Sequence, residues 1–319
     1  HGPTRIDAPM VRKSWLENGP GSNNHLRGRE PFVEVSWDKA EKIVAQELNR
    51  VKSKFGNSAI YGGSYGWASA GRFHHAQSQL HRFLNCIGGY TRSKFTYSFA
   101  AAEAMVPHIL GSYRAYLDTC TSWDLIKNST KLFVCFGGVP LKNGQICQGG
   151  TGNHYQKESI ISAASSGIEF VNVSPLKSDL MDEAGGKWLS LRPNTDTALM
   201  LGIAHTLHIE GLSDKDFLNK YSEGFDIFLN YLLGSSDGIQ KDANWAAEIC
   251  DIPANEIKEL ARRMVSNRTM ISVSWSLTRQ DHGEQPFWMA IMLASMIGQI
   301  GLPGGGFGFG YSATNHIGG

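Results

Sequence analysis

Two short segments carry the side chains whose types and spacing best suit chemistry. Ser98 lies in the run 96–99 and is followed closely by three alanines, while the segment 63–67, Gly-Ser-Tyr-Gly-Trp, ends 31 residues ahead of it. A serine in this position is, by itself, typical of a helix N-cap. A Gly-Ser-Tyr-Gly-Trp segment is, by itself, typical of the turn after a strand. The two segments contain a hydroxyl oxygen, the phenol of Tyr65 and the indole N–H of Trp67, which are groups that can bind a metal or donate hydrogen bonds.

Other motifs that carry chemistry have little support in the chain. The glycine clusters at 62–66 and 304–310 match neither the dinucleotide fingerprint nor the phosphate-binding P-loop. His205 and His208 are three residues apart, as in some metal sites, but their apolar neighbours favour a packed helix. The five cysteines are scattered, without a Cys-x-x-Cys pair, so neither a disulfide framework nor a local zinc or iron–sulfur site is indicated.

An alternation of strands and helices must position these residues. Residues 131–136 and 168–173 are largely apolar runs bounded by Gly and Pro, which is typical of parallel strands covered on both faces. Residues 155–164 form the helix between them, and residues 257–265 and 269–274 add a further helix and strand. This order predicts the α/β class, with a doubly wound and mostly parallel sheet flanked by helices.

The remaining elements follow from helix signals. Ser36 is expected to cap a helix that Gly56 ends, and residues 59–61 to form a short strand. Helical spacing also predicts helices around residues 73–84 and 199–209. Residues 286–297 form the longest apolar stretch, which is too short to span a bilayer and indicates a buried helix.

Length and charge set the broad class. At 319 residues the chain is long enough for two lobes, which we expect to cover residues 1–125 and 126–319. A hydrophobic content of 41% and a charged content of 18% are ordinary for a globular protein. The net charge of +1 gives no electrostatic reason to expect nucleic acid as a partner.

Polar residues follow three of the predicted strands. Open α/β sheets bind ligands beyond the carboxyl ends of their strands. The segments 137–143, 173–178 and 275–280 offer hydroxyls, amides or a cation there, where a phosphorylated ligand can bind. Each segment taken singly also fits ordinary loop polarity.

An ordered series of motifs resembles the single-subunit molybdenum reductases of S-oxides and N-oxides, which act on dimethyl sulfoxide, trimethylamine N-oxide and biotin sulfoxide. The pairing of segment 63–67 with Ser98 fits that family, and the strongest match runs from Gly283 to Gly308. Further matches span nearly the whole chain: 5–12, 32–38, 71–84, 107–111, 121–123 and 194–199. Such a series at family-like spacing is far more specific than any single motif.

The resemblance implies a role for each matching residue. Ser98 would be the protein ligand to molybdenum through its side-chain oxygen, and Tyr65 and Trp67 would stand over the metal. One guanine dinucleotide end of a bis(molybdopterin guanine dinucleotide) cofactor would be held by residues of the post-strand segments, with Trp67 also in contact. These cofactor residues are Lys142, Asn143, Ser174, Ser178, Asp196, Trp275, Ser276 and Arg279.

The chain departs from the family pattern at two places. The family usually has Gly-Asp before the Tyr-Ser pair, where this chain has Phe95 and Thr96. It also often has an aspartate at the position of Ser174. The first change affects the geometry of the turn before Ser98, and the second affects the affinity for a nucleotide.

The resemblance implies an enzyme that moves an oxygen atom from an S-oxide or N-oxide to molybdenum, with two electrons and two protons then releasing water. Tyr65 is typical of the dimethyl sulfoxide and biotin sulfoxide branches of this family, so S-oxides are expected as substrates slightly ahead of N-oxides. The partners would be the small oxide and an electron-donor protein, for which a c-type cytochrome is a candidate, and the periplasm is favoured over the cytoplasm. The chain is expected to be an internal segment of a longer protein. Two alternatives stay open: a catalytically silent nucleotide-binding α/β module, and the nitrate or formate branch, which uses cysteine, selenocysteine or aspartate as metal ligand.

Overall fold

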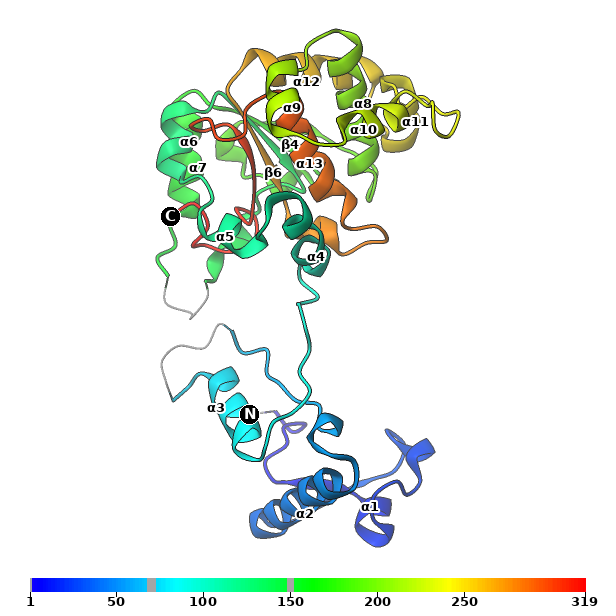
Figure 1. The fold of residues 1–319 in the computed structure, drawn as a ribbon. Helices are drawn as coiled ribbons and strands as arrows, with labels where there is room; N and C mark the ends of the chain where they lie inside the picture. The colour runs from blue at the N-terminus through cyan, green and yellow to red at the C-terminus, as the bar shows by residue number, and fades with distance from the viewer. Residues whose placement is uncertain (1, 68–72, 148–151) are drawn as a thin grey trace. The chain divides into compact units, whose positions relative to one another are not determined.

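The structure of the protein is a computed structural model that describes residues 2–67, 73–147 and 152–319 (Figure 1). The chain divides into two compact units. The first comprises residues up to 65 together with 76–93, and the second comprises 66–75 together with 94–319. The lobe boundary expected between residues 125 and 126 stays a prediction.

The first unit is small and holds two short strands and three α-helices. Strand β1 (Met10–Arg12) pairs antiparallel with β2 (Phe32–Glu34). The helices are α1 (Lys13–Asn18), α2 (Trp37–Phe55) and α3 (Ala76–Cys86). The hydroxyl of Ser36 accepts a hydrogen bond from the Lys39 N–H, and Gly56 is the C-cap of α2. Both predicted ends of this helix are therefore confirmed.

The strand predicted at residues 59–61 is wrong. Residues Asn57–Ala59 form a turn of 3-10 helix, and Tyr61 makes an isolated parallel bridge with Thr91. Ile60 and Tyr61 are β-prone, but one bridge is too short a pairing to extend into a ladder.

The second unit is built on a parallel sheet of five strands in the order β5-β4-β3-β6-β7. This arrangement confirms the predicted fold class. The strands are β3 (Leu132–Phe136), β4 (Glu169–Val173), β5 (Lys187–Leu189), β6 (Thr269–Val273) and β7 (Gly306–Phe309). Sequence analysis predicted β3, β4 and β6 to within one residue at each end, and it did not predict β5 or β7.

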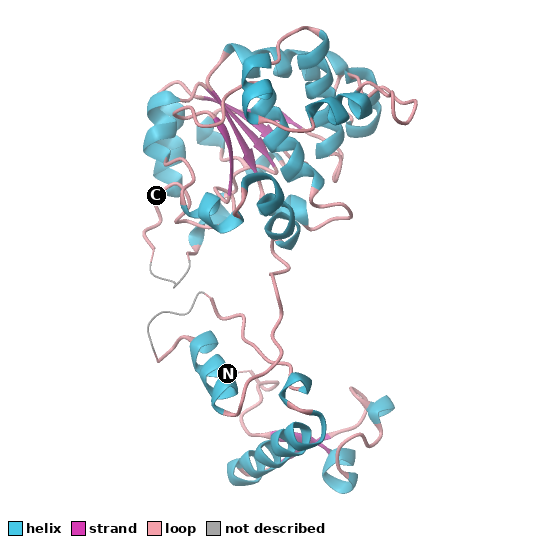
Figure 2. Ribbon diagram, viewed as in Figure 1, coloured by secondary structure: helices cyan, strands magenta, loops and turns pink. Residues whose placement is uncertain are grey.

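Helices lie on both sides of this sheet (Figures 1 and 2), with α6 and α7 on one side and α8, α12 and α13 on the other. The α-helices of the second unit are α4 (Ala100–Leu110), α5 (Tyr113–Asp118), α6 (Trp123–Ser129), α7 (Gln156–Ser165), α8 (Asp196–Ile209), α9 (Lys215–Tyr221), α10 (Phe225–Leu232), α11 (Ala243–Cys250), α12 (Ala254–Ser266) and α13 (Gln285–Met296).

The hydrophobic core lies between the sheet and the helices that cover its two faces. All five residues of β3 and of β6 are buried, which explains why β3 is apolar throughout and β6 largely apolar instead of alternating. The helix predicted at residues 286–297 is confirmed as α13, and it packs against α8. No helix in the described part of the chain is both long and apolar enough to cross a bilayer.

The order of strands places a topological switch point between β3 and β6. From β3 the chain continues through α7 to β4 on one side, whereas β6 pairs with β3 on the other side. Gly137 and Gly138 leave β3 with φ of 81° and 70°. A Cβ on Gly137 would lie 2.5 Å from the Cβ of Ser274, and one on Gly138 would lie 2.5 Å from the Cβ of Asp179. Glycine is therefore required here, because the loops after β4 and β6 approach the β3 exit closely.

Candidate functional site

Ser98 lies in the loop that leads into α4. The N-cap of this helix is Phe99, so the helix-cap interpretation of Ser98 is not what the structure shows. The N–H of Ser98 instead donates to the hydroxyl of Thr96 at 2.9 Å, and the N–H of Thr96 donates to the carboxylate of Glu103 at 3.1 Å. The loop is thus fixed by hydrogen bonds local to it.

The carbonyl of Ser98 is also held from a distant part of the chain. Nε of Arg279 donates to it at 3.0 Å, and the hydroxyl of Thr278 lies 3.3 Å from it. Thr278 ends the 3-10 turn η6 (Trp275–Thr278), which follows β6 directly. The structure therefore brings Ser98 and Arg279 together at the switch point, although they are 181 residues apart in sequence.

The turn before Ser98 contains a strained residue. Phe95 has a φ of 66°, in the left-handed region that glycine adopts readily and bulky residues rarely adopt. Its ring is exposed, and Nζ of Lys94 lies 5.0 Å from the ring centroid. The Phe95 position thus keeps a backbone conformation suited to glycine while carrying an aromatic side chain.

Trp275 and Ser276 lie beside this loop. The ring of Trp275 packs against Phe99, with centroids 4.0 Å apart. The indole Nε1 is buried and has no hydrogen-bond partner among the described residues, and an N–H can only donate. The hydroxyl of Ser276 lies 2.9 Å from that of Ser274. Trp275 therefore keeps one buried donor available next to the Ser98 loop.

The loop after β4 gathers a second set of predicted residues. The hydroxyl of Ser174, which is only 1% exposed, donates to Oδ2 of Asp179 at 2.7 Å and accepts from the N–H of Leu176 at 3.2 Å. Nζ of Lys142 lies 3.6 Å from Oδ1 of Asp179. Asp179 thereby joins Ser174 to Lys142, which lies in the turn η3 (Leu141–Gln145) after β3.

Asp196 begins α8 and is only 2% exposed. Its Oδ1 is buried and lacks a hydrogen-bond partner within the described part of the chain. Burial raises the pKa of this carboxyl from 3.8 to about 7, since desolvation disfavours the charged form. An unpaired buried carboxylate is costly, and such groups are candidates for ligand binding.

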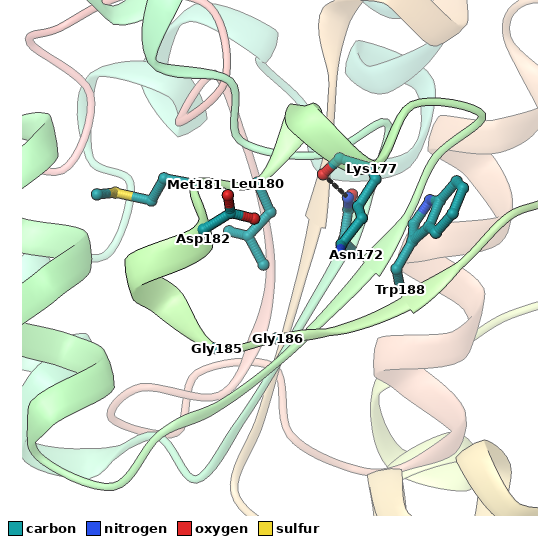
Figure 3. Close-up of a pocket in the computed structure, with 8 residues that line it drawn as sticks. All are labelled: Asn172, Lys177, Leu180, Met181, Asp182, Gly185, Gly186 and Trp188. Carbon is teal, nitrogen blue, oxygen red and sulfur yellow. Dashed lines mark hydrogen bonds between the residues drawn. The ribbon is translucent and has the colours of Figure 1, made fainter.

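A cavity of about 270 Å³ lies behind the β4 loop (Figure 3). Nδ2 of Asn172 donates to the carbonyls of Leu176 and Lys177 at 3.3 and 3.1 Å, and Nε1 of Trp188 donates to the carbonyl of Ser174 at 2.8 Å. The cavity is lined by Asn172, Lys177, Leu180, Met181, Asp182, Gly185, Gly186 and Trp188. Two of the side chains that line it, Asn172 and Trp188, therefore fix the backbone of the β4 loop.

The other predicted site residues are placed as follows. Asn143 is exposed in η3, and Ser178 is exposed in the turn η4 (Lys177–Asp179). Tyr65 belongs to the first unit and is 61% exposed, whereas Trp67 belongs to the second unit. The placement of these two aromatic residues over Ser98 stays a prediction. Within the described ranges, no three side chains of His, Cys, Asp and Glu gather to form a metal site.

Sequence analysis missed Thr278 and Asp179. Thr278 lies directly before Arg279 in a segment that was already singled out, so its polar side chain was a usable signal. Asp179 lies one residue beyond the segment considered after β4, and nothing local distinguishes it from a solvated loop acid. Its contact with Ser174 depends on the turn η4, which folds the chain back toward the end of β4.

Known proteins of similar fold and sequence can now be compared. Acetylene hydratase from Pelobacter acetylenicus matches 85% of this chain with 34% of its own, at a TM-score of 0.52 and 20% identity, which indicates a shared fold. Dimethyl sulfoxide/trimethylamine N-oxide reductase from Cereibacter sphaeroides is 45% identical over 99% of the chain. Biotin sulfoxide reductase from the same organism is 45% identical over 98% of the chain. Trimethylamine-N-oxide reductase from Haemophilus influenzae is 43% identical over 98% of the chain.

The alignments cover only part of each relative. The chain spans 38%, 42% and 38% of the length of these three reductases. The family model for molybdopterin oxidoreductases matches residues 5–317, which is nearly all of this sequence. The strand order, the polar loops at the switch point and this match agree, and the chain belongs to the molybdopterin oxidoreductase family.

Proposed function

We propose that this chain is the part of a molybdenum-dependent S-oxide or N-oxide reductase that carries the metal-ligand serine and one nucleotide cradle. The observation that carries the proposal is the bond from Arg279 to the Ser98 carbonyl. It joins the proposed metal ligand to the loop after β6, at the switch point where open α/β sheets bind ligands. The three reductases that match the chain act, by their names, on S-oxides and N-oxides.

Unpaired polar atoms support a molybdopterin cofactor in its guanine dinucleotide form. Asp196 offers a buried carboxylate oxygen and Trp275 a buried N–H, neither with a partner in the described part of the chain. The N–H groups of a guanine base would satisfy the Asp196 carboxylate, and a bound acceptor would satisfy the Trp275 indole. The residues present therefore fit the group.

Each residue has a defined role in this proposal. The bound cofactor would supply the two-electron chemistry of oxygen-atom transfer. The Ser98 hydroxyl oxygen is a hard donor suited to molybdenum, and the bonds to its carbonyl orient the loop. Arg279 uses Nε on Ser98 and keeps its other N–H groups for a pyrophosphate. Tyr65 and Trp67 would donate hydrogen bonds to the substrate oxygen, and Lys142, Asn143 and Ser178 would face the nucleotide.

Substrate and partners follow from the same assignment. Tyr65 is typical of the dimethyl sulfoxide and biotin sulfoxide branches of the family that the chain resembles, which favours S-oxides slightly over N-oxides. An electron-donor protein is required because each turnover consumes two electrons. The periplasm is the proposed location. The nitrate or formate branch is disfavoured because Ser98 stands where that branch has cysteine, selenocysteine or aspartate.

The proposal is tested on the holoenzyme by measuring molybdenum and guanine nucleotide per chain, and reduction of dimethyl sulfoxide, trimethylamine N-oxide and biotin sulfoxide. Ser98→Ala should abolish most turnover and alter the spectrum of the metal. The matched control is Ser112→Ala, which removes the N-cap bond to Ala115 and should cost only about 1 kcal/mol of stability. Wild-type turnover in Ser98→Ala would overturn the assignment, and a protein that binds nucleotide without molybdenum would indicate a silent module instead.

A further inference from the structure

The Ser174 hydroxyl has a fixed polarity. Its hydrogen is directed to the carboxylate of Asp179, because an ionised carboxylate can only accept. One lone pair of the same oxygen accepts from the N–H of Leu176. A serine hydroxyl has one hydrogen and two lone pairs, so a single acceptor position remains for a ligand.

The carboxylate that fixes this polarity is itself firmly held. The side chain of Asp179 is 15% exposed, and its backbone carbonyl accepts from the N–H of Val139 at 2.7 Å. Gly138 leaves space for Asp179, since a Cβ there would lie 2.5 Å from it. Behind the loop, Asn172 donates to the carbonyls of Leu176 and Lys177, the second of these bonds being drawn in Figure 3, and Trp188 donates to the carbonyl of Ser174. Asp179 therefore presents its carboxylate to Ser174 from a backbone fixed on two sides.

The cations of the predicted site lie in different loops. Lys142, 67% exposed, lies at Oδ1 of Asp179 and offsets its negative charge, so its ammonium is already paired beside the β4 loop. Arg279, beside Ser98 after β6, supplies cationic donors to another part of the carboxyl edge of the sheet.

We propose that Asp179 is a positioning residue that makes Ser174 a hydrogen-bond acceptor, so that the β4 loop takes the hydroxyl or N–H donors of a nucleoside and not its phosphates. The phosphates are left to Arg279, after β6. This inference rests on the proposed nucleotide cofactor and adds to it the direction in which the nucleotide lies. Ribose hydroxyls are the chemical group that fits the one remaining lone pair of Ser174.

The test measures guanine nucleotide per chain in holoenzyme assembled with limiting cofactor. Ser174→Ala and Asp179→Ala should each lower occupancy roughly five- to tenfold, the effect of one lost hydrogen bond. The double variant should retain as much nucleotide as Ser174→Ala alone, because Asp179 acts only through the Ser174 hydroxyl. Asp179→Asn keeps one acceptor for the Ser174 hydroxyl and should retain more nucleotide than Asp179→Ala. The matched control is Asp182→Ala, a nearby loop acid that lines the cavity and should leave occupancy unchanged.

Two outcomes separate this inference from the proposed function. Guanine nucleotide in the wild-type enzyme together with wild-type occupancy in Asp179→Ala overturns the role of Asp179 alone. The role of Asp179 is also overturned if the double variant loses nucleotide occupancy by the product of the two single losses and the cofactor-free variants lose thermal stability to match. Such a result indicates a structural effect. A wild-type holoenzyme without guanine nucleotide overturns the proposed cofactor form and this inference together.

Discussion

Asp196→Asn should make the cofactor-free protein more stable at alkaline pH and make the holoenzyme poorer at retaining a guanine nucleotide. The two effects have opposite signs because one carboxylate is responsible for both. Burial without a partner for Oδ1 destabilises the ionised form, while the same unpaired oxygen is the proposed acceptor for the guanine base. An amide removes the charge and keeps the shape.

The magnitude follows from the pKa of Asp196, which burial raises from 3.8 to about 7. In that interval the folded chain keeps a proton that the unfolded chain has released, so the free energy of unfolding decreases as pH rises. A shift of this size corresponds to at most about 4 kcal/mol, lost fully above the folded pKa. The N-terminal turn of α8 favours a negative charge and returns about 1 kcal/mol of this. We therefore expect a gain of up to about 3 kcal/mol for Asp196→Asn at about pH 8.

The assay is urea unfolding of the cofactor-free protein at about pH 5.5 and about pH 8, on either side of the folded pKa. The stability difference between the two pH values should shrink in Asp196→Asn. The matched control is Asp226→Asn, an exposed acid in the first turn of α10, which should leave that difference unchanged. If Asp196→Asn is no more stable than wild type at the higher pH, the reasoning from burial is refuted.

Three further changes test the Ser98 region and its neighbours. Arg279→Gln should lower the molybdenum and nucleotide content together, because a hydrogen bond to a charged group contributes about 1.5–3 kcal/mol. It should also alter the spectrum of the metal that remains. Normal content with an unchanged spectrum would show that the bond from Arg279 to Ser98 is dispensable. The Phe95→Gly variant should be about 1 kcal/mol more stable than the Phe95→Ala variant, because both lose the ring and only glycine relieves the positive φ. Equal melting temperatures would argue against backbone strain at residue 95. Tyr65→Phe should reduce turnover by about 10²–10³ with normal metal content, and affect S-oxides and N-oxides unequally; unchanged kinetics with both substrate classes would remove Tyr65 from the site.

The sequence predicted the parts of the fold that local composition controls. Strands β3, β4 and β6 were predictable because both faces of each strand are largely buried and most of their residues are apolar. Strand β7 was not, since its Gly-Phe-Gly-Phe sequence becomes a strand only by pairing with β6. The tripeptide 59–61 failed for the converse reason, because β-prone residues without a partner strand make one bridge. Pairing is a tertiary property that a local pattern does not contain.

The site was predictable to a similar degree. Ser98, Ser174 and Arg279 were identified as candidates through the family resemblance, and their types suit the chemistry. Which residues lie together was not predictable from spacing, because the bond between Arg279 and Ser98 joins segments 181 residues apart. The partnership of Ser174 with Asp179 likewise depends on a turn whose geometry the sequence does not state.

The same long-range bond has a consequence for the order of events during synthesis. The Ser98 carbonyl receives its hydrogen bonds from residues that emerge from the ribosome about 180 residues later. At about 5–20 residues per second, that interval is of the order of ten seconds or more. Until β6 has joined the sheet, the Ser98 loop lacks its anchor, and the closure of so long a loop is entropically unfavourable. If Ser98 ligates the proposed cofactor, we expect the cofactor to be inserted after this unit has folded, and not during its translation.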